Sequence, residues 1–387
     1  MLYIAIEPAF NISSWCRETV NGINSEICRR RISAIYLNDI GELPRSVTEG
    51  EFLVIVCSTP KWQKRAADIG NKRGYSVIVA GSGLLSTGNF SSVSRNIDAC
   101  VSFAIKKLCD IGCKNIALYA VNPFSAHDVA VSEAYFGKVA DVCRNSGQAF
   151  YNNGSLADCF KTFENAEEKP DGVICLNDYA AVSFVKHLKS KGEELPKIIS
   201  FATTRLISVF SPKISAIYCD YLGFGEAIFG IMTLLKKSSA ASVVTVGIKS
   251  VFKEGETTDK FNGKDNENAA YVKPRVSDKA YNFKTENSKA AEKSDNFEFY
   301  GDIEIQQMTR IENLINRCDN TDLVIVDEML KGLQPIDIAE KCFLSESGVK
   351  YRCKKMYDDC GCSGKKEFLR LVSEYISEGA VKELIKN

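Results

Sequence analysis

The chain has 387 residues, 45% of them hydrophobic and 25% charged, which is long enough for two or three domains and typical of a globular protein. Lys+Arg and Asp+Glu are both 49, so net charge excludes a general attraction to nucleic acid and leaves only a local basic patch. The 15 cysteines are scattered and odd in number, which predicts free thiols rather than a disulfide framework.

The N-terminal residues and the apolar segments indicate a cytoplasmic protein. Residues 1–7 carry no basic region and no cleavage site, so we expect no signal peptide. The longest apolar helical stretch, Tyr221 to Leu235, contains Glu226 and is too short to span a bilayer. We therefore expect a cytoplasmic chain that does not contact a membrane.

Strands and helices alternate over the first 253 residues. Apolar runs of strand length lie at 2–6, 32–37, 52–57, 75–80, 116–120, 148–151, 173–176 and 197–201. Helical spacing is found at 15–27, 61–72, 97–111, 129–145 and 178–191. Continuous apolar strands separated by helices predict parallel sheets covered on both faces. The pattern restarts near residue 96, which predicts two α/β lobes.

Three segments of this part resemble the sensor domain of LacI/GalR-type regulators. They are Ile105 to Leu118, Asp171 to Gly192 with its Asn-Asp turn, and Ile214 to Ile228. The resemblance spans about residues 1–253 and implies an α/β two-lobed, periplasmic-binding-protein-like (type I) sensor domain. It implies lobe 1 at about 1–95 and 222–238, lobe 2 at about 96–219 and 241–253, and crossovers near 94–97, 219–222 and 237–241.

A small-molecule effector of such a domain would bind between the lobes, at the carboxyl ends of the strands. The strand ends predict a ligand-binding cleft formed by Glu7, Phe10, Ser58 and Ser82 on one lobe and by His127, Asn177, Thr203 and Asp220 on the other lobe or the crossovers. Two of these residues have a simpler alternative. Asn177 can be only a turn residue and helix cap, and we favour His127 as an exposed residue at a helix start.

Two departures from the LacI/GalR pattern concern the ligand. The strand that usually ends Gly-Phe-Asp-Asp reads Ser-Phe-Ala-Thr-Thr over residues 200–204, so a carboxylate acceptor for sugar hydroxyls is missing. The helix that usually brings a cleft arginine, over residues 124–133, contains none. The cleft is therefore expected to bind a ligand other than a sugar, or no ligand.

A polar stretch, residues 254–300, follows the predicted sensor and has the composition of a flexible linker, because it cannot bury enough apolar surface to offset the entropy of ordering. The next segment, 301–318, contains a helix from Asp302 to Arg317 with an apolar face. That face comprises Ile305, Met308, Ile311, Leu314 and Ile315. It is predicted either to pack on the next domain or to form a dimer interface.

Residues 319–387 are predicted to form a small all-α domain. A helix capped by Asn320 or Thr321 ends at Gly332, and the next begins at Pro335, where the missing N–H is tolerated. Ser345 is predicted to cap a third helix, which buries Val349, Cys353 and Met356. A closing helix, 365–377, is predicted to bury Phe368, Leu371, Val372 and Tyr375.

This domain resembles the LuxR/GerE-type helix-turn-helix. The resemblance is carried by Gly332, Leu333, Ile338, Ala339, Leu344, Ser345, Val349 and Lys350, whereas Arg352 and Cys353 depart from it. A helix on such a core can enter the DNA major groove, and nearby lysines can contact phosphates. The predicted DNA-contact residues are Ser345, Glu346, Ser347, Lys350, Tyr351, Arg352, Lys354, Lys355, Lys365 and Lys366.

The combination predicts a DNA-binding transcriptional regulator, a homodimer on double-stranded DNA, in which the sensor acts through dimerisation or through release of the DNA-binding domain. The alternative is a ligand-binding or scaffold protein whose helical domain contacts protein. We expect no enzyme and no cofactor, since there are two histidines, no glycine-rich phosphate loop and no nucleophile motif. Cys353, Cys360 and Cys362 lack a fourth ligand, so no metal site is expected.

Overall fold

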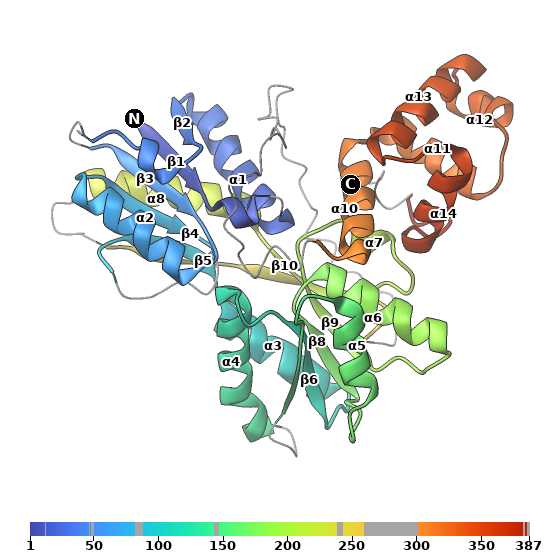
Figure 1. Ribbon diagram of the computed structural model, residues 1–387, viewed down its shortest axis with the longest axis horizontal. Coiled ribbons are helices and arrows are strands. Elements are labelled where there is room, and N and C mark those ends of the chain that lie inside the picture. The colour runs from blue at the N-terminus through green and yellow to red at the C-terminus, as the bar shows by residue number, and fades with distance from the viewer. Residues whose placement is uncertain are drawn as a thin grey trace.

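The computed structural model describes residues 1–11, 13–45, 47, 50–81, 88–142, 147–237, 243–258, 301–381 and 384. The predicted two-lobed α/β architecture is confirmed, with one six-stranded sheet in each lobe (Figure 1). A group of helices from the C-terminal part of the chain lies against the second lobe. Most of the predicted linker, 259–300, lies outside the described residues.

The first lobe is built on a fully parallel sheet with the strand order β11-β5-β4-β3-β1-β2. The central strand, β3 (Phe52–Val56), is buried over its whole length. Its alternate residues contact helices α1 (Ser14–Arg30) and α8 (Tyr221–Lys237) on one face and helix α2 (Pro60–Lys72) on the other. Its elements are β1 (Leu2–Ile6), η1 (Pro8–Phe10), α1 (Ser14–Arg30), β2 (Ala34–Leu37), η2 (Ile40–Glu42), β3 (Phe52–Val56), α2 (Pro60–Lys72), β4 (Ser76–Ala80), β5 (Ser91–Arg95), α8 (Tyr221–Lys237) and β11 (Thr245–Ile248).

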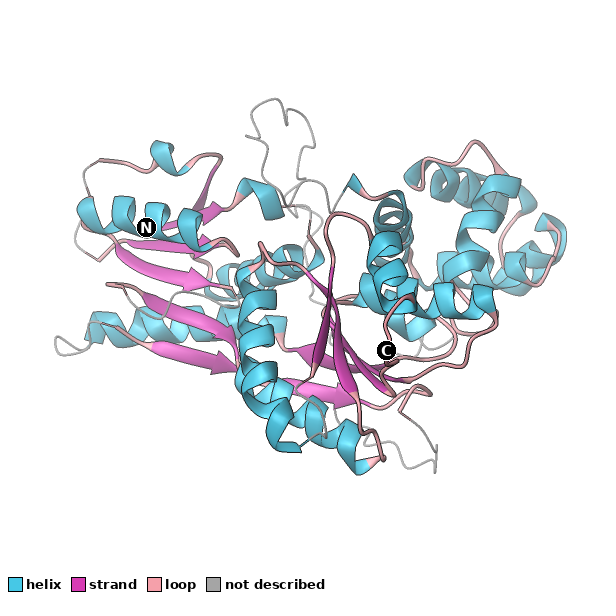
Figure 2. Cartoon of the chain, turned by 60° about the horizontal axis from the view of Figure 1, so that its bottom comes forward, coloured by secondary structure: helices cyan, strands magenta, loops and turns pink. Residues whose placement is uncertain are grey.

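The second lobe contains a separate sheet (Figure 2). Its strand order is β12-β10-β9-β8-β6-β7, and the pair of β10 and β12 is the antiparallel one. Helices α3 and α4 cover one face, and α5 and α6 cover the other. Its elements are α3 (Ile97–Asp110), β6 (Ile116–Val121), α4 (Ala126–Val142), β7 (Gln148–Tyr151), α5 (Leu156–Glu164), β8 (Gly172–Cys175), α6 (Asp178–Lys191), β9 (Lys197–Ala202), α7 (Leu206–Val209), β10 (Ser215–Cys219) and β12 (Ser250–Lys253).

The third crossover lies later in the chain than the sequence pattern suggested. Strand β11 pairs with β5 in the first lobe and β12 with β10 in the second, so the chain changes lobe at Lys249 and not at 237–241. The apolar run at 243–252 is therefore two short strands with the crossover between them. The start of the predicted linker also belongs to the second lobe, since Thr257 and Thr258 are buried and bond to Ser215.

Helices α1 and α8 approach each other closely because each has a glycine at the contact. A Cβ atom at Gly22 would lie 2.0 Å from the backbone oxygen of Tyr221, and one at Gly225 would lie 2.1 Å from the oxygen of Gly22. No larger residue fits at either position. This contact ties α1 to the helix that follows the second crossover.

Among the described residues from 301 onward, the structure shows the helices α10 (Ile303–Arg317), α11 (Asn320–Leu330), α12 (Pro335–Cys342), α13 (Glu346–Asp359) and α14 (Lys365–Tyr375). Ser345 caps α13 as predicted, because its hydroxyl accepts the N–H of Gly348 at 3.1 Å. Helix α11 is capped by Asp319, one residue before the predicted caps. The side chains predicted to face inward from α13 and α14 are all buried.

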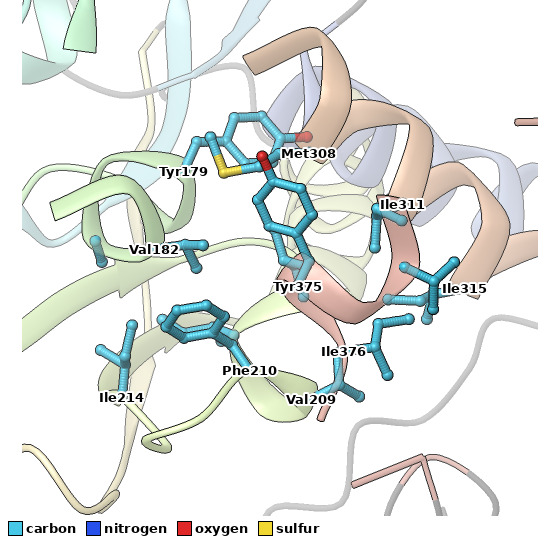
Figure 3. Packing of buried hydrophobic residues seen from close by; sticks show 14 of the residues in the cluster. Tyr179, Val182, Val209, Phe210, Ile214, Met308, Ile311, Ile315, Tyr375 and Ile376 are labelled. Atoms are coloured by element: carbon cyan, nitrogen blue, oxygen red, sulfur yellow. The ribbon is translucent and has the colours of Figure 1, made fainter. Parts of the chain in front are cut away.

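The C-terminal helices share one hydrophobic core with the second lobe. Met308, Ile311 and Ile315 of α10 pack between α6 and α7 on one side and Tyr375 and Ile376 on the other (Figure 3). The apolar face of α10 is thus buried within one chain, which agrees with the packing alternative and leaves that face unavailable for a dimer interface. In the described part of the chain, every cysteine is a free thiol and no helix is both long and apolar enough to cross a bilayer.

We predict that Ile311→Ala lowers the free energy of unfolding by about 2–5 kcal/mol, because it removes a fully buried side chain between the second lobe and the C-terminal helices. The matched control is Ile303→Ala on the same helix, where the side chain is 73% exposed and the expected change is within about 0.5 kcal/mol. Urea unfolding followed by tryptophan fluorescence and circular dichroism measures both. Equal unfolding midpoints for the two variants would contradict the shared core.

Candidate functional site: the interlobe cleft and the C-terminal helices

A cavity of about 110 Å³ lies between the lobes, at the carboxyl ends of the strands. Five of the eight predicted cleft residues line it: Phe10, Ser58, His127, Asn177 and Thr203. The lobes also touch directly beside it, where the Ala126 N–H donates to the backbone oxygen of Ser58 at 3.3 Å. The strand-end argument therefore located the cleft correctly.

The other three predicted cleft residues do not line the cavity. Glu7 is buried and its carboxylate accepts the backbone N–H groups of Ser58 and Thr59, so it supports the loop that carries a lining residue. Asp220 accepts the N–H of Gly223 at the start of α8 and acts as a helix cap. Ser82 lies outside the described residues.

Asn177 and His127 had alternative interpretations. Asn177 fulfils both of its roles, since its amide oxygen caps α6 through the N–H of Ala180 and its side chain lines the cavity. His127 lies in the first turn of α4 as predicted, but it is not an exposed helix-start residue. It is half-buried against the cavity, and its ring lies edge-on to Phe201 with centroids 6.0 Å apart.

The sequence argument missed most of the lining. The additional residues come from α1, from the carboxyl ends of β4, β5, β6, β8, β9 and β10 or the loops that follow them, and from the starts of α4, α6 and α8. They are Ser14, Trp15, Thr19, Gly81, Arg95, Asn122, Ser125, Asp128, Leu176, Tyr179, Phe201, Cys219, Tyr221 and Phe224. Arg95 was missed because β5 itself was not predicted: its sequence Ser-Ser-Val-Ser-Arg has a single apolar residue. The alternating burial of Ser91, Val93 and Arg95 is visible only in the structure, so the sequence offered no clear signal for this strand.

Arg95 is the one cationic residue of the lining and is 6% exposed. Its guanidinium lies over the ring of Phe201, 5.5 Å from the centroid, and its Nη2 is 3.5 Å from the backbone oxygen of Ala202. Within the described part of the chain, no carboxylate forms an ion pair with it. Removal of one partner from a buried ion pair costs about 3–5 kcal/mol of stability, because it leaves a buried charge without a counterion.

Burial also changes the protonation of two neighbouring groups. Burial and the nearby Arg95 charge lower the pKa of His127 to about 3, so its imidazole is neutral at physiological pH. Burial raises the pKa of Asp128 to about 7, although the Asn122 N–H and the Ser125 hydroxyl donate to its carboxylate and act in the opposite direction. Asp128 is thus already bonded inside its own loop.

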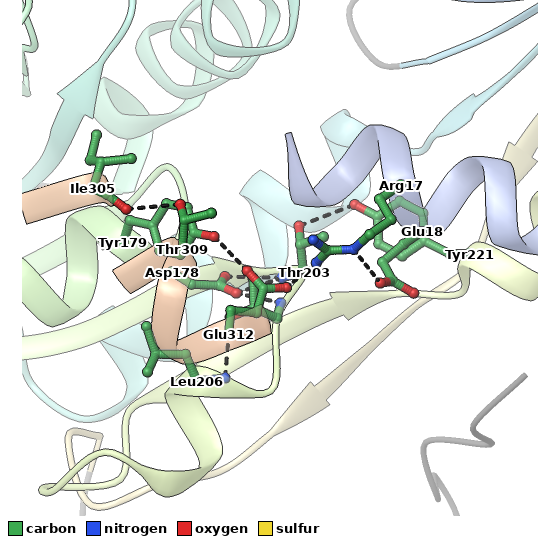
Figure 4. Close-up of polar contacts among 11 residues, drawn as sticks. Arg17, Glu18, Asp178, Tyr179, Thr203, Leu206, Tyr221, Ile305, Thr309 and Glu312 are labelled. Carbon is green, nitrogen blue, oxygen red and sulfur yellow. Dashed lines mark hydrogen bonds and ion pairs between the residues drawn. The ribbon is translucent and has the colours of Figure 1, made fainter. Parts of the chain in front are cut away.

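A buried carboxylate connects the cleft to the C-terminal helices. Glu312 of α10 is 1% exposed and accepts hydrogen bonds from Arg17 of α1 and from the hydroxyl of Tyr179 of α6 (Figure 4). Burial, followed by the neighbouring Glu312 charge, raises the pKa of Tyr179, so its hydroxyl remains a donor. The two lobes and α10 therefore meet at one side chain.

This junction adjoins the cavity on both sides. Tyr179 itself lines the cavity, and α1 contributes Trp15 and Thr19, which flank Arg17 in sequence. A displacement of one lobe relative to the other would change the distance between Arg17 and Tyr179. Glu312 can keep both bonds only if α10 moves with them.

The predicted DNA-contact residues lie on and around α13, at the end of the C-terminal helices remote from the second lobe (Figure 1). Ser345, Glu346, Ser347, Lys350, Tyr351, Lys354, Lys355 and Lys366 are exposed, and Lys365 is partly exposed. Lys350 pairs with Glu346 at 2.6 Å, but both side chains are exposed. Such an i,i+4 pair is worth about 0.3–0.5 kcal/mol, which a phosphate contact can replace.

Arg352 differs from the other predicted contacts. Its Nη1 donates to Asp319 at 2.9 Å and to Asp322 at 2.7 Å, at the start of α11. The hydrogen bond to Asp322, and to a lesser extent the one to Asp319, raises the pKa of Arg352 above its ordinary value. The residue that departs from the LuxR/GerE pattern therefore fixes α13 against α11.

No protein-family model and no curated protein matches the sequence. The fold is similar to that of solved structures with TM-scores above one half. A LacI family transcriptional regulator from Enterococcus faecium with bound ribose is 16% identical, with 66% of this chain and 98% of that chain covered and a TM-score of 0.54. Transcription regulator CcpA of Lactococcus lactis is 16% identical, with 67% and 99% covered and a TM-score of 0.55. An uncharacterized protein from Actinobacillus succinogenes is 13% identical, with 67% and 99% covered and a TM-score of 0.55.

These similarities establish a LacI-type sensor fold. The two lobes, residues 1–258, make up about two thirds of the 387 residues, so the covered share corresponds to their length. The predicted resemblance of residues 1–253 is thereby confirmed at the level of fold.

We predict that His127→Gln makes the protein less sensitive to acid. The folded pKa of His127, about 3, lies below its ordinary value of 6.5, so between these values the unfolded chain binds more protons and acidification lowers stability. Between about pH 7 and about pH 4.5 the variant should lose roughly 2–3 kcal/mol less unfolding free energy than the unaltered chain. Urea unfolding at both pH values measures this, and equal losses would contradict it.

A double-mutant cycle with Arg17→Met and Glu312→Gln should give a coupling energy of about 1–3 kcal/mol, because each single change removes the buried ion pair, although Arg17 keeps a longer pair with Glu18 at 3.4 Å. The matched control is the exposed pair Arg317–Asp359, which also involves α10 and should give a coupling energy below about 0.5 kcal/mol. Both are measured by urea unfolding. Similar coupling energies at the two pairs would show that the Glu312 junction has no special role.

Proposed function

We propose that the chain is a ligand-responsive transcriptional regulator, not an enzyme, in which the interlobe cleft senses a small molecule and the C-terminal helices bind double-stranded DNA. The observation that carries this proposal is the Arg17–Glu312–Tyr179 junction, because it links the cavity lining to the helix on which the C-terminal domain is built. The LacI-type fold supports the sensor half. The DNA-binding half is supported by the sequence resemblance and by the surface of α13.

The proposed signal is a change in the angle between the lobes. A ligand in the cleft would contact both lobes, so it binds one lobe arrangement better than another and shifts the population toward it. The Enterococcus faecium regulator of the same fold has bound ribose. The cleft residues of this chain differ, so the ribose bound to that regulator does not identify the ligand of this chain.

The proposed readout is the orientation of the C-terminal domain. Helix α10 is held by the second lobe through its apolar face and by the first lobe through Arg17. Movement of the lobes would therefore turn α13 as part of one body. In a homodimer, which we propose on the same grounds as the DNA binding, this would change the spacing of two reading helices relative to the half-sites.

The proposed reading surface combines base and phosphate contacts. Ser347, Lys350, Tyr351 and Lys354 occupy the outward face of α13 and would reach base edges. Lys355, Lys365 and Lys366 would contact phosphates, which adds affinity without sequence selection. Arg352 is engaged by Asp319 and Asp322, so we propose that it positions α13 and contacts no DNA.

A second candidate, a protein-binding helical domain, is favoured by exposed apolar residues on α12 and α13. Phe343 is 96% exposed, Tyr351 72% and Ile336 56%. Phe343 also has a left-handed backbone with φ of 54°, which is unfavourable for an aromatic residue. A chain with this function would have no salt-dependent affinity for DNA.

The decisive test is DNA retention by the purified full chain, first with genomic fragments and then with the fragments selected from them. We expect Lys350→Ala with Lys354→Ala to abolish retention at moderate salt, because the double variant lacks two of the four proposed base contacts. Both residues are exposed, so the fold should be unchanged by circular dichroism.

The matched control is Lys61→Ala with Lys64→Ala on α2, which removes the same charge from an exposed helix of the first lobe. This variant should retain DNA as the unaltered chain does. Equal loss of DNA retention in both double variants would show that the effect comes from net charge and not from the surface of α13. Absence of DNA retention by the unaltered chain at low salt would favour the protein-binding candidate.

A further inference from the structure

Several polar groups of the cleft are already bonded within the protein, whereas most donors of Arg95 have no partner in the described part of the chain. Asn177 caps α6, Thr203 shares a hydrogen bond with Tyr221 at 3.2 Å, and Asp128 accepts from Asn122 and Ser125. Arg95 has five N–H groups, and its contacts are one long bond to the oxygen of Ala202 and a hydrogen bond with the thiol of Cys219. Most of its donors therefore remain for a ligand.

A second unsatisfied group lies beside it. The Nδ1 atom of His127 is shielded from solvent and has no hydrogen-bond partner in the described part of the chain. Both residues line the cavity, and both pack on Phe201, with Arg95 over the ring and His127 at its edge. A neutral imidazole has one N–H to donate. Phe201 thus lies against both a guanidinium that keeps several donors for a ligand and an imidazole nitrogen with no partner in the described part of the chain.

The remaining walls limit the size and polarity of a ligand. Phe10, Trp15, Tyr221 and Phe224 contribute aromatic surface to the same cavity. Its volume of about 110 Å³ is close to the roughly 150 Å³ of an engineered cavity that holds benzene. A single ring fits these dimensions, whereas a disaccharide does not.

The charged and titratable groups that face this site are few. Arg95 is the permanent cation, Asp128 is the carboxylic acid, and His127, Tyr179, Cys219 and Tyr221 complete the set. Asp128 is bonded to its own loop, and Tyr179 donates to Glu312. An anion entering the cleft therefore meets one uncompensated positive charge.

We propose that the cleft binds a small aromatic monocarboxylate, with its carboxylate on Arg95 and His127 and its ring among the aromatic side chains. This inference deepens the proposed function and rests on the cleft being its sensory site. Arginine is suited to the role, because its planar donors match the two oxygens of a carboxylate. Transfer of the apolar ring from water into the cavity supplies the remaining affinity.

Calorimetry on the full chain tests the proposal with benzoate, benzamide, acetate and ribose as probes. Benzoate should bind, and benzamide should bind roughly 10- to 100-fold more weakly, as expected for a lost hydrogen bond to a charged group. Acetate should also bind more weakly than benzoate, because it lacks the ring. Equal binding of benzoate and benzamide, tighter binding of ribose, or no binding of benzoate would each overturn the proposal.

Arg95→Met should abolish benzoate binding, and Arg95→Lys should restore part of it. Circular dichroism and thermal unfolding report whether each variant folds. If Arg95→Met does not fold, His127→Phe and the probe series on the unaltered chain decide the question. Retained benzoate affinity in a folded Arg95→Met chain would overturn the assignment.

DNA retention is measured separately on the ligand-free chain. Benzoate binding without DNA retention would contradict the regulatory proposal and support the carboxylate site. DNA retention without benzoate binding would support the regulatory proposal and contradict the carboxylate site. The two failures are therefore distinguishable.

Discussion

The Glu312 carboxylate is the constraint on which the arrangement of this chain depends. A carboxylate that is 1% exposed needs hydrogen bonds to offset its lost hydration, and it obtains them from Arg17 of the first lobe and Tyr179 of the second. Neither lobe can move away without weakening one of these bonds. The hydrophobic contact of α10 then transmits the constraint, since its other face is buried against the second lobe and α14.

This arrangement bears on how a domain at the C-terminal end of a sensor can be regulated. Release of the domain would expose the apolar face of α10, including Met308, Ile311 and Ile315, which are all completely buried. Burial of an aliphatic side chain is worth about 1.5–3 kcal/mol, so release carries a large cost that one ligand cannot easily supply. Helix α13 already faces away from the lobes (Figure 1). For the proposed regulator, reorientation is therefore more economical than release, which is one of the two routes that the sequence suggested, the other being dimerisation.

Much of the fold could be predicted from the sequence, because its strands are continuous apolar runs and its helices carry recognisable caps such as Ser345. The parts that bear on the site were missed because polar residues occupy buried positions there, whereas helix α5 was missed although its buried residues are apolar. Strand β5 contains three serines, and with it the prediction missed Arg95. Glu312 stands between Met308 and Ile315 on the apolar face of α10, at spacings of four and three residues. A charged residue on such a stripe was a detectable signal, but its partners come from segments about 130 and 300 residues away.

The chemistry of the cleft follows from single residues within a conserved arrangement of strands. The acidic pair that the LacI/GalR pattern places after its phenylalanine is replaced by Ala202 and Thr203, and the acceptor given to Arg95 there is the backbone oxygen of Ala202. In the part of the chain that the structure describes, no carboxylate forms an ion pair with Arg95, so its guanidinium keeps donors inside a small aromatic cavity. The sequence difference that removes an acceptor for sugar hydroxyls therefore occurs beside a cation without a counterion, which favours an anion over a sugar as the ligand.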